Sequence, residues 1–441
     1  MTQITLRLDI PSLQVEVIEL LEKTSKQMAI AHNGRWFHNS AETKYREFQV
    51  QLEEQIRSVK NLELRIAIVA PMKAGKSTII NVTAGEEIVP SHNDAMTTLP
   101  TEIVFRADLT EPILILSPHT CAAFQQAIQA LQQKIQTIGI DEALKIANYP
   151  HLRELLAEIE QGFSLTAETY GRNSCVDTLK VLNHLIRLNN KLLPEQDIIE
   201  SVNDFPRVET NFWLASHSDK LQQQGKLVVV DTPGPNEAGQ EKLKHIVADQ
   251  LRQCSLVAIV LDYTQLQGVA AAEVKEEVAR VIELRGKKNL YVLINKIDQR
   301  GIGSNYMTTD QVLQFVNTNF GISNPEQIFE ISAINALLAT QFLREMEKHP
   351  ETPIAQLETA PALAKATLGL DWQEELTQIS AEKLKAKAEK LWQLSGFAAF
   401  LEKSIRTLRS EGTHRCMRNA LELSSNCLSK LYADIDGEIK K

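Results

Sequence analysis

A short segment at residues 70–78, APMKAGKST, has the residue types and spacing of a phosphate-binding loop. It follows an apolar, β-branched run at 66–69, typical of a buried parallel strand, and precedes a segment with helical character at 78–84. In such a loop the backbone N–H groups and the helix N-terminus converge on an anion, and the Lys76 ammonium adds a full positive charge. The first glycine that is usual in this motif is Ala70 here, so the match is imperfect.

The predicted roles within this loop follow from the positions of its residues. Ser77 comes directly after Lys76 and offers its hydroxyl to a magnesium ion shared with the outer phosphates. The loop residues predicted to bind nucleotide are Met72, Lys73, Ala74, Gly75, Lys76, Ser77 and Thr78.

A second strand candidate, at 227–230, ends in Asp231, and Gly234 follows three residues later. An aspartate at the end of a neighbouring strand can reach the magnesium through water, while the Gly234 N–H can contact a terminal phosphate. Asp231 is therefore a predicted metal ligand.

A third strand candidate, at 291–294, is followed by Asn295, Lys296 and Asp298. The Asp298 carboxylate accepts hydrogen bonds only, so it suits guanine, which presents an N1–H beside an amino group, whereas adenine does not. A fourth candidate, at 328–331, leads into Ser332 and Ala333, whose backbone N–H groups are predicted to meet the guanine carbonyl.

Each of these pieces has a simpler interpretation as a turn or a capped strand end. Four pieces in this order, each directly after a strand, favour a site for GTP or GDP over one for ATP.

The segment MTTLPT at 96–101 is predicted to supply a second magnesium ligand. We favour the Thr97 hydroxyl over that of Thr98, with the Thr97 backbone meeting the terminal phosphate. The alternative is a Ser/Thr turn before Pro100.

Composition limits the class of protein. At 441 residues the chain is too long for one compact core, so two domains are expected. The net charge of −9, without a dense Lys/Arg run, argues against nucleic-acid binding and against a polybasic membrane patch. No apolar run approaches the ~20 residues of a transmembrane helix, and the N-terminal residues lack the hydrophobic centre expected of a signal peptide. The chain is expected to be cytoplasmic, with membrane contact left open.

The five cysteines are scattered, odd in number and without paired metal spacing, so they predict neither zinc nor structural disulfides. Cys254, Cys416 and Cys427 are interpreted as small core hydrophobes.

Helical periodicity dominates both ends of the chain. Apolar residues recur at helical spacing within 13–28 and 45–59, and again within 384–408 and 416–439, with an interruption near Ser395 and Gly396. Trp36 and Phe37, between the first two helices, are a partner site or, as we favour, pack between those helices. Because the last stripe must be buried, we expect the terminal helices to form an antiparallel bundle.

The expected fold is therefore of the α/β class: a P-loop GTPase domain with a mostly parallel sheet, flanking helices and a helical insertion, plus an antiparallel bundle of N- and C-terminal segments. The expected boundaries are 1–61 for the N-terminal helices, 62–375 for the GTPase domain with its insertion at about 119–200, and 376–441 for the C-terminal helices.

The insertion is expected to form a lobe on the sheet edge. It begins after a strand at 112–116 and contains helices at about 121–137, 141–162 and 175–192. Alternation at Val208, Thr210, Phe212 and Leu214 predicts an edge strand that leads back to Asp231.

A further buried strand is expected at 256–262, with a helix at 271–283. Asp262, Tyr263 and Gln265, at the strand's C-terminal end, touch nucleotide or a partner, or cap the loop.

Four strings in this sequence resemble the dynamin superfamily: MKAGKST at 72–78, MTTLPT at 96–101, DTPGPNEAG at 231–239 and LDYTQL at 261–266. The likeness extends to bacterial dynamin-like proteins related to the enterobacterial clamp-binding protein of the replication fork. The resemblance implies a homodimer formed through the GTPase domains, GTP hydrolysis that accelerates on assembly, and a helical bundle that transmits the nucleotide state.

Water handling is predicted to differ from that of Ras-like enzymes, whose glutamine position is Pro235 here. Lys73 occupies the loop position where dynamins carry a serine associated with a monovalent cation and guanylate-binding proteins carry an arginine finger. We hypothesise that Lys73 is catalytic and supplies positive charge at the β,γ-bridging oxygen, in place of K⁺. The alternative is an exposed lysine that raises nucleotide affinity. Water positioning is assigned to the Thr97 backbone.

Two functions are consistent with these residues. The first is a dynamin-like GTPase with Mg²⁺, favoured by the intact magnesium ligands. The second is a GTP-dependent switch or adaptor with negligible hydrolysis that recruits protein partners through the helical bundle, for example at replication sites. The pentapeptide QLSGF at 393–397 partly matches a clamp-binding peptide, but its position on an apolar stripe favours core packing.

Overall fold

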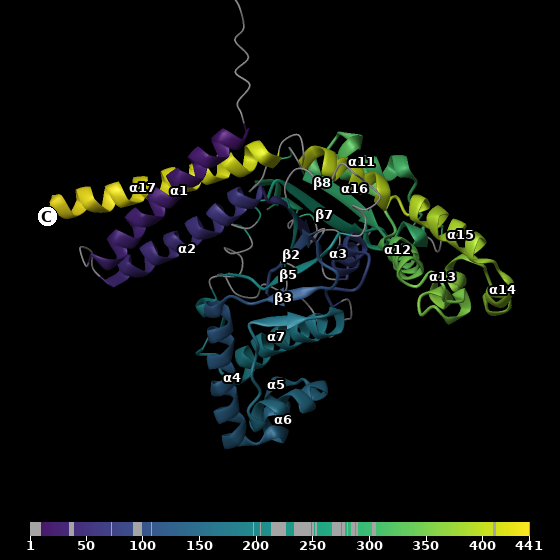
Figure 1. Ribbon diagram of the computed structural model, residues 1–441, viewed down its shortest axis with the longest axis horizontal. Helices are drawn as coiled ribbons and strands as arrows, with labels where there is room; N and C mark the ends of the chain where they lie inside the picture. The colour runs from purple at the N-terminus through teal and green to yellow at the C-terminus, as the bar shows by residue number, and fades with distance from the viewer. Residues whose placement is uncertain are drawn as a thin grey trace, which may run out of the picture. The chain divides into compact units, whose positions relative to one another are not determined.

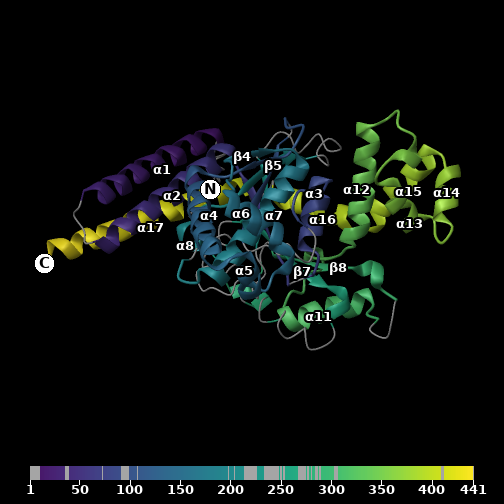
Figure 2. The same cartoon turned by 90° about the horizontal axis from the view of Figure 1, so that it is seen from below.

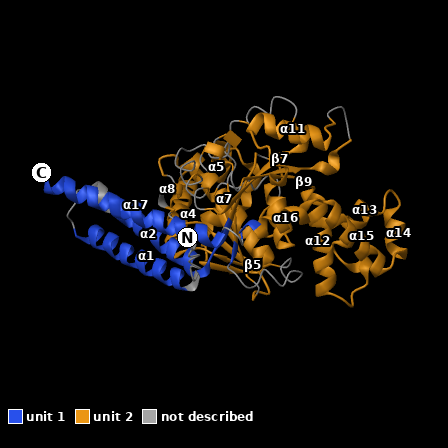
Figure 3. Ribbon diagram, turned by 90° about the horizontal axis from the view of Figure 1, so that it is seen from above, with its two compact units in different colours: residues 1–65, 223–227, 407–441 blue, residues 66–222, 228–406 orange. Residues whose placement is uncertain are grey.

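The chain divides into two compact units, which are coloured separately in Figure 3. The first comprises residues 1–65, 223–227 and 407–441, and the second comprises 66–222 and 228–406. The computed structural model describes residues 10–34, 39–71, 73–90, 99–106, 108–196, 198–202, 204–212, 226–232, 248, 251, 254–266, 275, 278–279, 281–283, 287, 290–301, 306–408 and 412–440. Trp36, Phe37 and most of the helix expected at 271–283 lie outside these ranges.

The described residues of the first unit form a bundle of three helices, α1 (Ile10–Asn33), α2 (Asn39–Asn61) and α17 (Thr413–Ile439), visible in Figures 1 and 2. The predicted stripes supply its core, which contains Val17, Leu21, Met28, Tyr45, Phe48, Leu52, Val59, Cys416, Met417, Ala420, Cys427 and Leu431. This confirms the packing of the N-terminal helices against the C-terminal one. It also confirms Cys416 and Cys427 as core residues. Ile439 was predicted to be buried, but it is 78% exposed at the end of α17.

Polar contacts connect the three helices and show how α2 and α17 run relative to each other. Near the end of α2, Ser58 Oγ lies 3.7 Å from Cys416 Sγ at the start of α17. At the other end, Tyr45 donates to Asp434 Oδ2 over 2.6 Å, so α2 and α17 are antiparallel. Between α1 and α17, the hydroxyls of Thr24 and Ser424 lie 2.6 Å apart in the core.

We predict that the Thr24–Ser424 bond stabilises the bundle. Thr24→Val keeps the side-chain shape but leaves the buried Ser424 hydroxyl without this bond, which should cost about 1–3 kcal/mol. Ser424→Ala in the same background should recover most of that loss, because it removes the stranded group. Amide hydrogen exchange of α1 and α17 in the full chain measures both effects. Additive losses in the double variant would contradict the prediction.

Within the described residues of the chain, nine strands form one mixed sheet in the order β4-β3-β5-β2-β6-β1-β7-β8-β9. The strands are β1 (Leu64–Val69), β2 (Thr101–Arg106), β3 (Ile113–Ile115), β4 (Glu168–Tyr170), β5 (Arg207–Asn211), β6 (Leu227–Asp231), β7 (Leu256–Asp262), β8 (Leu290–Asn295) and β9 (Ile328–Glu330).

The half of the sheet that carries the predicted motifs is parallel, since β1 pairs with β7, β7 with β8, and β8 with β9 in parallel. Every residue of β1, β7 and β8 is buried, as the β-branched, apolar runs predict. Cys254 lies in the core beneath these strands, as expected. The carboxyl ends of these strands therefore meet at one edge, where an open parallel sheet binds its ligands.

The edge-strand prediction at 208–214 is wrong, because β5 lies inside the sheet between β3 and β2. Its charged residues Arg207 and Glu209 are buried in ion pairs and do not face solvent. Arg207 contacts Glu102 over 3.0 Å, and Glu209 contacts Arg106 over 2.6 Å. Burial acts to raise the pKa of Glu209, but the hydrogen bond from Arg106 and the charge of Arg207 outweigh it and lower that pKa.

The insertion forms a helical lobe at the β4–β3 end of the sheet (Figure 1). Its helices are α4 (Pro118–Ile138), α5 (Ile140–Ala147), α6 (Arg153–Gln161), α7 (Arg172–Leu192) and α8 (Ile198–Ser201). The single helix expected at 141–162 is two helices. Asn148 adopts a left-handed conformation at the end of α5, and Pro150 then begins a 3₁₀ turn.

The remaining α-helices in the described part of the second unit are α3 (Lys76–Ala84), α11 (Thr309–Phe320), α12 (Ala333–Lys348), α13 (Ala360–Thr367), α14 (Trp372–Gln378), α15 (Ala381–Leu394) and α16 (Phe397–Thr407). The expected boundary at 375/376 assigned α15 and α16 to the bundle. The structure assigns them to the second unit, because Leu384 and Ala388 of α15 share a core with Phe342 of α12. The predicted interruption at Ser395 and Gly396 separates α15 from α16. Among the described helices, none has the length and apolar character that crossing a membrane requires.

Candidate nucleotide-binding site

The predicted phosphate loop connects β1 to α3, as its sequence requires. Gly75 is the N-cap of α3, and no side chain caps the helix there, so its first N–H groups face the position predicted for phosphate. Gly75 has a φ of +98°, and a Cβ at this position would lie 2.2 Å from Asn295 Nδ2. Only glycine fits this backbone and this close approach.

Asn295, at the end of β8, joins three parts of the site. Its amide donates to the Ala74 carbonyl over 2.8 Å, and its carbonyl accepts from the Ala333 N–H over 2.9 Å. The side chain is buried, so both bonds are made away from water. Asn295 thereby connects the phosphate loop to the start of α12 and to the base-recognition segment, the name used here for the residues predicted to contact the base, Asp298, Ser332 and Ala333.

The charged groups predicted for phosphate and magnesium lie side by side. The Lys76 ammonium contacts the Asp231 carboxylate at the end of β6, and both side chains are almost fully buried. The next residue, Thr232, donates its hydroxyl to the Ile68 carbonyl of β1 over 2.9 Å, which fixes β6 beside the strand that carries the loop. Ser77 and Thr78, in the first turn of α3, are partly exposed. A metal bound at this position would take oxygen ligands from Ser77 and Asp231, as Mg²⁺ prefers.

The predicted base-recognition residues share one small region at the carboxyl ends of β8 and β9. Asp298 lies in a 3₁₀ turn, Ile297–Gln299, and its Oδ1 accepts a 2.5 Å hydrogen bond from the Ser332 hydroxyl. The same hydroxyl accepts from the Asn335 N–H and so caps α12. The bond from Ser332 fixes the position of Asp298 Oδ1. The hydrogen bonds described for this part of the chain do not involve the other carboxylate oxygen, which can therefore accept from a ligand.

The two N–H groups predicted to meet the guanine carbonyl donate within the protein. Ser332 N–H donates to the Ser395 carbonyl over 2.8 Å, and Ala333 N–H donates to Asn295. Gly396, next to Ser395, has a φ of +71°, and a Cβ there would lie 2.1 Å from the Glu330 carbonyl oxygen. The junction of α15 and α16 is thus in direct contact with the base-recognition segment, and Ser332 or Ala333 must share or exchange its acceptor to bind a base.

Several predicted residues lie outside the described residues. These are Met72, Thr97, Thr98, Gly234 and Pro235. Lys73 is described: it is exposed and has a φ of +66°, a left-handed conformation that few residues with a side chain adopt. Its catalytic role stays a prediction.

Around the C-terminal end of α3, side chains that the sequence analysis missed hold the helix in place. Arg344 of α12 donates to the Ala84 carbonyl over 2.7 Å and to Glu86 Oε1 over 2.6 Å. Both charged side chains are buried. The partners are 258 residues apart in the chain, so no local pattern indicates the pair. Asn81 of α3 acts similarly, since its buried amide bonds the backbone of Ile88 and Val89.

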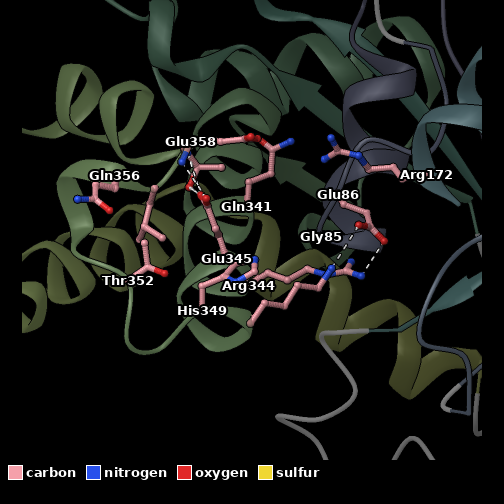
Figure 4. A pocket seen from close by; sticks show the side chains of 13 residues that line it. Gly85, Glu86, Arg172, Gln341, Arg344, Glu345, His349, Thr352, Gln356 and Glu358 are labelled. Atoms are coloured by element: carbon pink, nitrogen blue, oxygen red, sulfur yellow. Dashed lines mark hydrogen bonds and ion pairs between the residues drawn. The ribbon is translucent and has the colours of Figure 1, made fainter.

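A cavity of about 410 Å³ adjoins this end of α3 (Figure 4). Figure 4 shows the Arg344 side chain pointing toward Glu86, with Arg172 of α7 on the side of Glu86 away from Arg344. Burial and then the charges of Arg344 and Arg172 lower the pKa of Lys348, which also lines the cavity. The predicted nucleotide-binding residues are at the other end of α3, so this cavity is separate from the candidate site.

Residues 66–297 match the Dynamin family. This match runs from the third residue of β1 to just past β8, and therefore includes the phosphate loop, Asp231, Asn295 and Lys296. The chain belongs to the dynamin family. The resemblance seen in its sequence strings is confirmed.

Two curated relatives and two solved structures extend the comparison. The chain is 32% identical over 382 residues to the clamp-binding protein CrfC of Escherichia coli and to that of E. coli strain K12, over 85% of this chain and 50% of theirs. The chain thus spans half the length of these relatives. Two structures of an oligomerised bacterial dynamin pair, linked to long-range sensing and tethering of membranes, align with 98% of this chain and 54% of theirs. Their TM-scores are 0.38 and 0.35 and their identities 12% and 14%, too weak a likeness for further argument.

We predict that the Arg344–Glu86 pair stabilises the dynamin-type domain. Arg344→Met removes the bond to Ala84 and leaves the buried Glu86 carboxylate without its principal partner, which should cost about 3–5 kcal/mol in the free energy of unfolding. Urea denaturation followed by circular dichroism measures this loss.

Lys348→Met is the matched control. Lys348 lies 3.9 Å from Glu86 and its side chain is 51% exposed, so removing its charge should change stability by less than about 0.5 kcal/mol. Equal losses in the two variants would show that Arg344 has no special role.

Proposed function

We propose that this chain binds GTP with Mg²⁺ and hydrolyses it as a dynamin-like GTPase, with paired GTPase domains and a helical bundle that follows the nucleotide state. The observation that carries this proposal is the position of Asp298. Its carboxylate lies at the carboxyl ends of the parallel strands and accepts from the Ser332 hydroxyl. The next residue, Ala333, donates to Asn295, which in turn bonds the phosphate loop at Ala74. An oriented carboxylate suits the two adjacent donors of guanine.

The phosphate end of the site supports the same proposal. The N-terminus of α3, the Lys76 ammonium and the Ser77 hydroxyl belong to one turn of helix, with Asp231 in contact with Lys76. Bound Mg²⁺ would neutralise charge on the transferred phosphoryl group. Thr97 as a second metal ligand and Gly234 as a phosphate contact are further parts of the proposal.

A GTP-dependent adaptor that recruits protein partners is the second candidate. The observation that favours it is the name of the curated relatives, clamp-binding proteins. The pentapeptide at 393–397 does not support a clamp contact, because Phe397 is fully buried and the Ser395 carbonyl is bonded to Ser332.

We expect GTP turnover per molecule to climb with protein concentration, because a second copy completes the active site in an assembly-dependent GTPase. The assay is phosphate release with Mg²⁺ and K⁺ across a wide protein range, beside equilibrium binding of GDP and ADP. A flat rate would contradict paired catalysis. Tight GTP binding without turnover would favour the adaptor, and equal affinity for GDP and ADP would reject both.

We also propose that the Lys73 ammonium provides the positive charge that dynamins obtain from a monovalent cation. Lys73→Ala should lower kcat about tenfold or more while changing GDP affinity less than about threefold, because the charge acts on the transition state. Lys73→Gly is the matched variant, since it removes the same charge but relieves the left-handed backbone. Both variants should lose turnover equally, with part restored by added K⁺. Full turnover in Lys73→Ala, with or without K⁺, would show that the lysine is not catalytic.

A further inference from the structure

Asp262 is a buried carboxylate beside the base-recognition segment. It ends β7, and in the parallel register of β7 and β8 its backbone partner is Asn295. Its side chain is only 3% exposed. A carboxylate this deep in the protein requires compensating partners, so the question is what each oxygen contacts.

The two oxygens of Asp262 have different partners. Oδ1 accepts from the Thr264 N–H over 2.9 Å and from the Thr264 hydroxyl over 2.7 Å, and so caps the short turn Tyr263–Gln265. Oδ2 accepts from the Lys296 ammonium over 2.5 Å. Capping of the turn therefore accounts for Oδ1 only, whereas Oδ2 contacts Lys296.

Lys296 is the residue from which the Asp298 turn begins. Its φ is +68°, a left-handed conformation that is costly for a residue with a side chain, and it forms the N-cap of the Ile297–Gln299 turn. The ion pair with Asp262 fixes this residue from the neighbouring strand. Since Asp298 lies two residues later, the direction of its carboxylate depends on this conformation.

The far end of the same turn contacts the residue next to Asp262. Arg300 directly follows the turn, and its guanidinium lies 5.1 Å from the centre of the Tyr263 ring. Tyr263 is itself fixed, because its hydroxyl donates to the Met307 carbonyl over 2.8 Å. Consecutive residues of the LDYTQL segment thus contact both ends of the turn that carries Asp298.

We propose that Asp262 is a positioning residue for base recognition, which holds Lys296 and, through it, aligns the Asp298 carboxylate with guanine. This inference rests on the proposed function, since it assumes that the site binds a guanine nucleotide. It assigns Asp262 a specificity role without contact with the base. A purely structural Asp262 would affect all nucleotides equally, whereas a positioning Asp262 affects the part of the affinity that Asp298 supplies.

The test compares GDP with inosine diphosphate, which lacks the 2-amino group that Asp298 is predicted to contact. Asp262→Asn keeps an oxygen for Thr264 but removes the charge that holds Lys296. We expect this variant to bind GDP about tenfold more weakly and to lose at least about threefold of the wild-type preference for GDP over inosine diphosphate, because charged hydrogen bonds depend strongly on geometry. Thr264→Val is the matched control, and its preference should stay within about twofold of wild type.

A second variant keeps the test independent of any loss of folding at β7. Lys296→Met breaks the same ion pair from the other side, and the double variant should show no further loss of preference, since both changes remove one interaction. If the wild-type chain prefers GDP to inosine diphosphate and Asp262→Asn shows the same preference, the proposal is wrong. A wild-type chain that does not prefer GDP to ADP would reject the proposed function itself, which is a separate outcome.

Discussion

The candidate site depends on the two hydrogen bonds of the buried Asn295 amide. One goes to the carbonyl of the phosphate loop at Ala74, and the other comes from the first N–H of α12 at Ala333. Because its Nδ2 donates to Ala74 and its Oδ1 accepts from Ala333, these two bonds set the orientation of the amide, and a side chain on Gly75 would occupy its position. The residues predicted to bind phosphate and base are therefore connected by direct hydrogen bonds, even though 221 positions separate Ala74 from Asn295 in the chain.

Helix α3 is fixed at both ends, and α12 contributes to both. At the N-terminal end, α12 begins where Asn295 meets the phosphate loop. At the C-terminal end, its Arg344 bonds the last carbonyl of α3 at Ala84 and the Glu86 carboxylate. A displacement of the phosphate loop along the α3 axis would strain both connections. The buried ion pair thus fixes the C-terminal end of α3 against α12, besides its contribution to stability.

The sequence predicted the parts of the site that local patterns determine. β-branched runs identified the strands, and the motif residues follow them because parallel strands place their carboxyl ends at one edge. Pairing between distant residues was not predictable. The alternation at 208–214 predicted an edge strand, but β5 lies inside the sheet, with Arg207 and Glu209 buried against Glu102 and Arg106. The role of Arg344 also has no local signal, since its partner lies in a different element.

Base recognition in this fold must change a contact elsewhere. If Ser332 N–H binds the guanine carbonyl, it gives up or shares the Ser395 carbonyl, and the junction of α15 and α16 loses its bond to the site. If Ala333 N–H binds instead, the change falls on Asn295 and hence on the phosphate loop. One N–H cannot be donated fully to two acceptors. In the first case the changed contact is at the start of α16, where Phe397 packs against Phe400 and Trp392. Gly396 permits this contact, because only a residue without a side chain can lie against the Glu330 carbonyl.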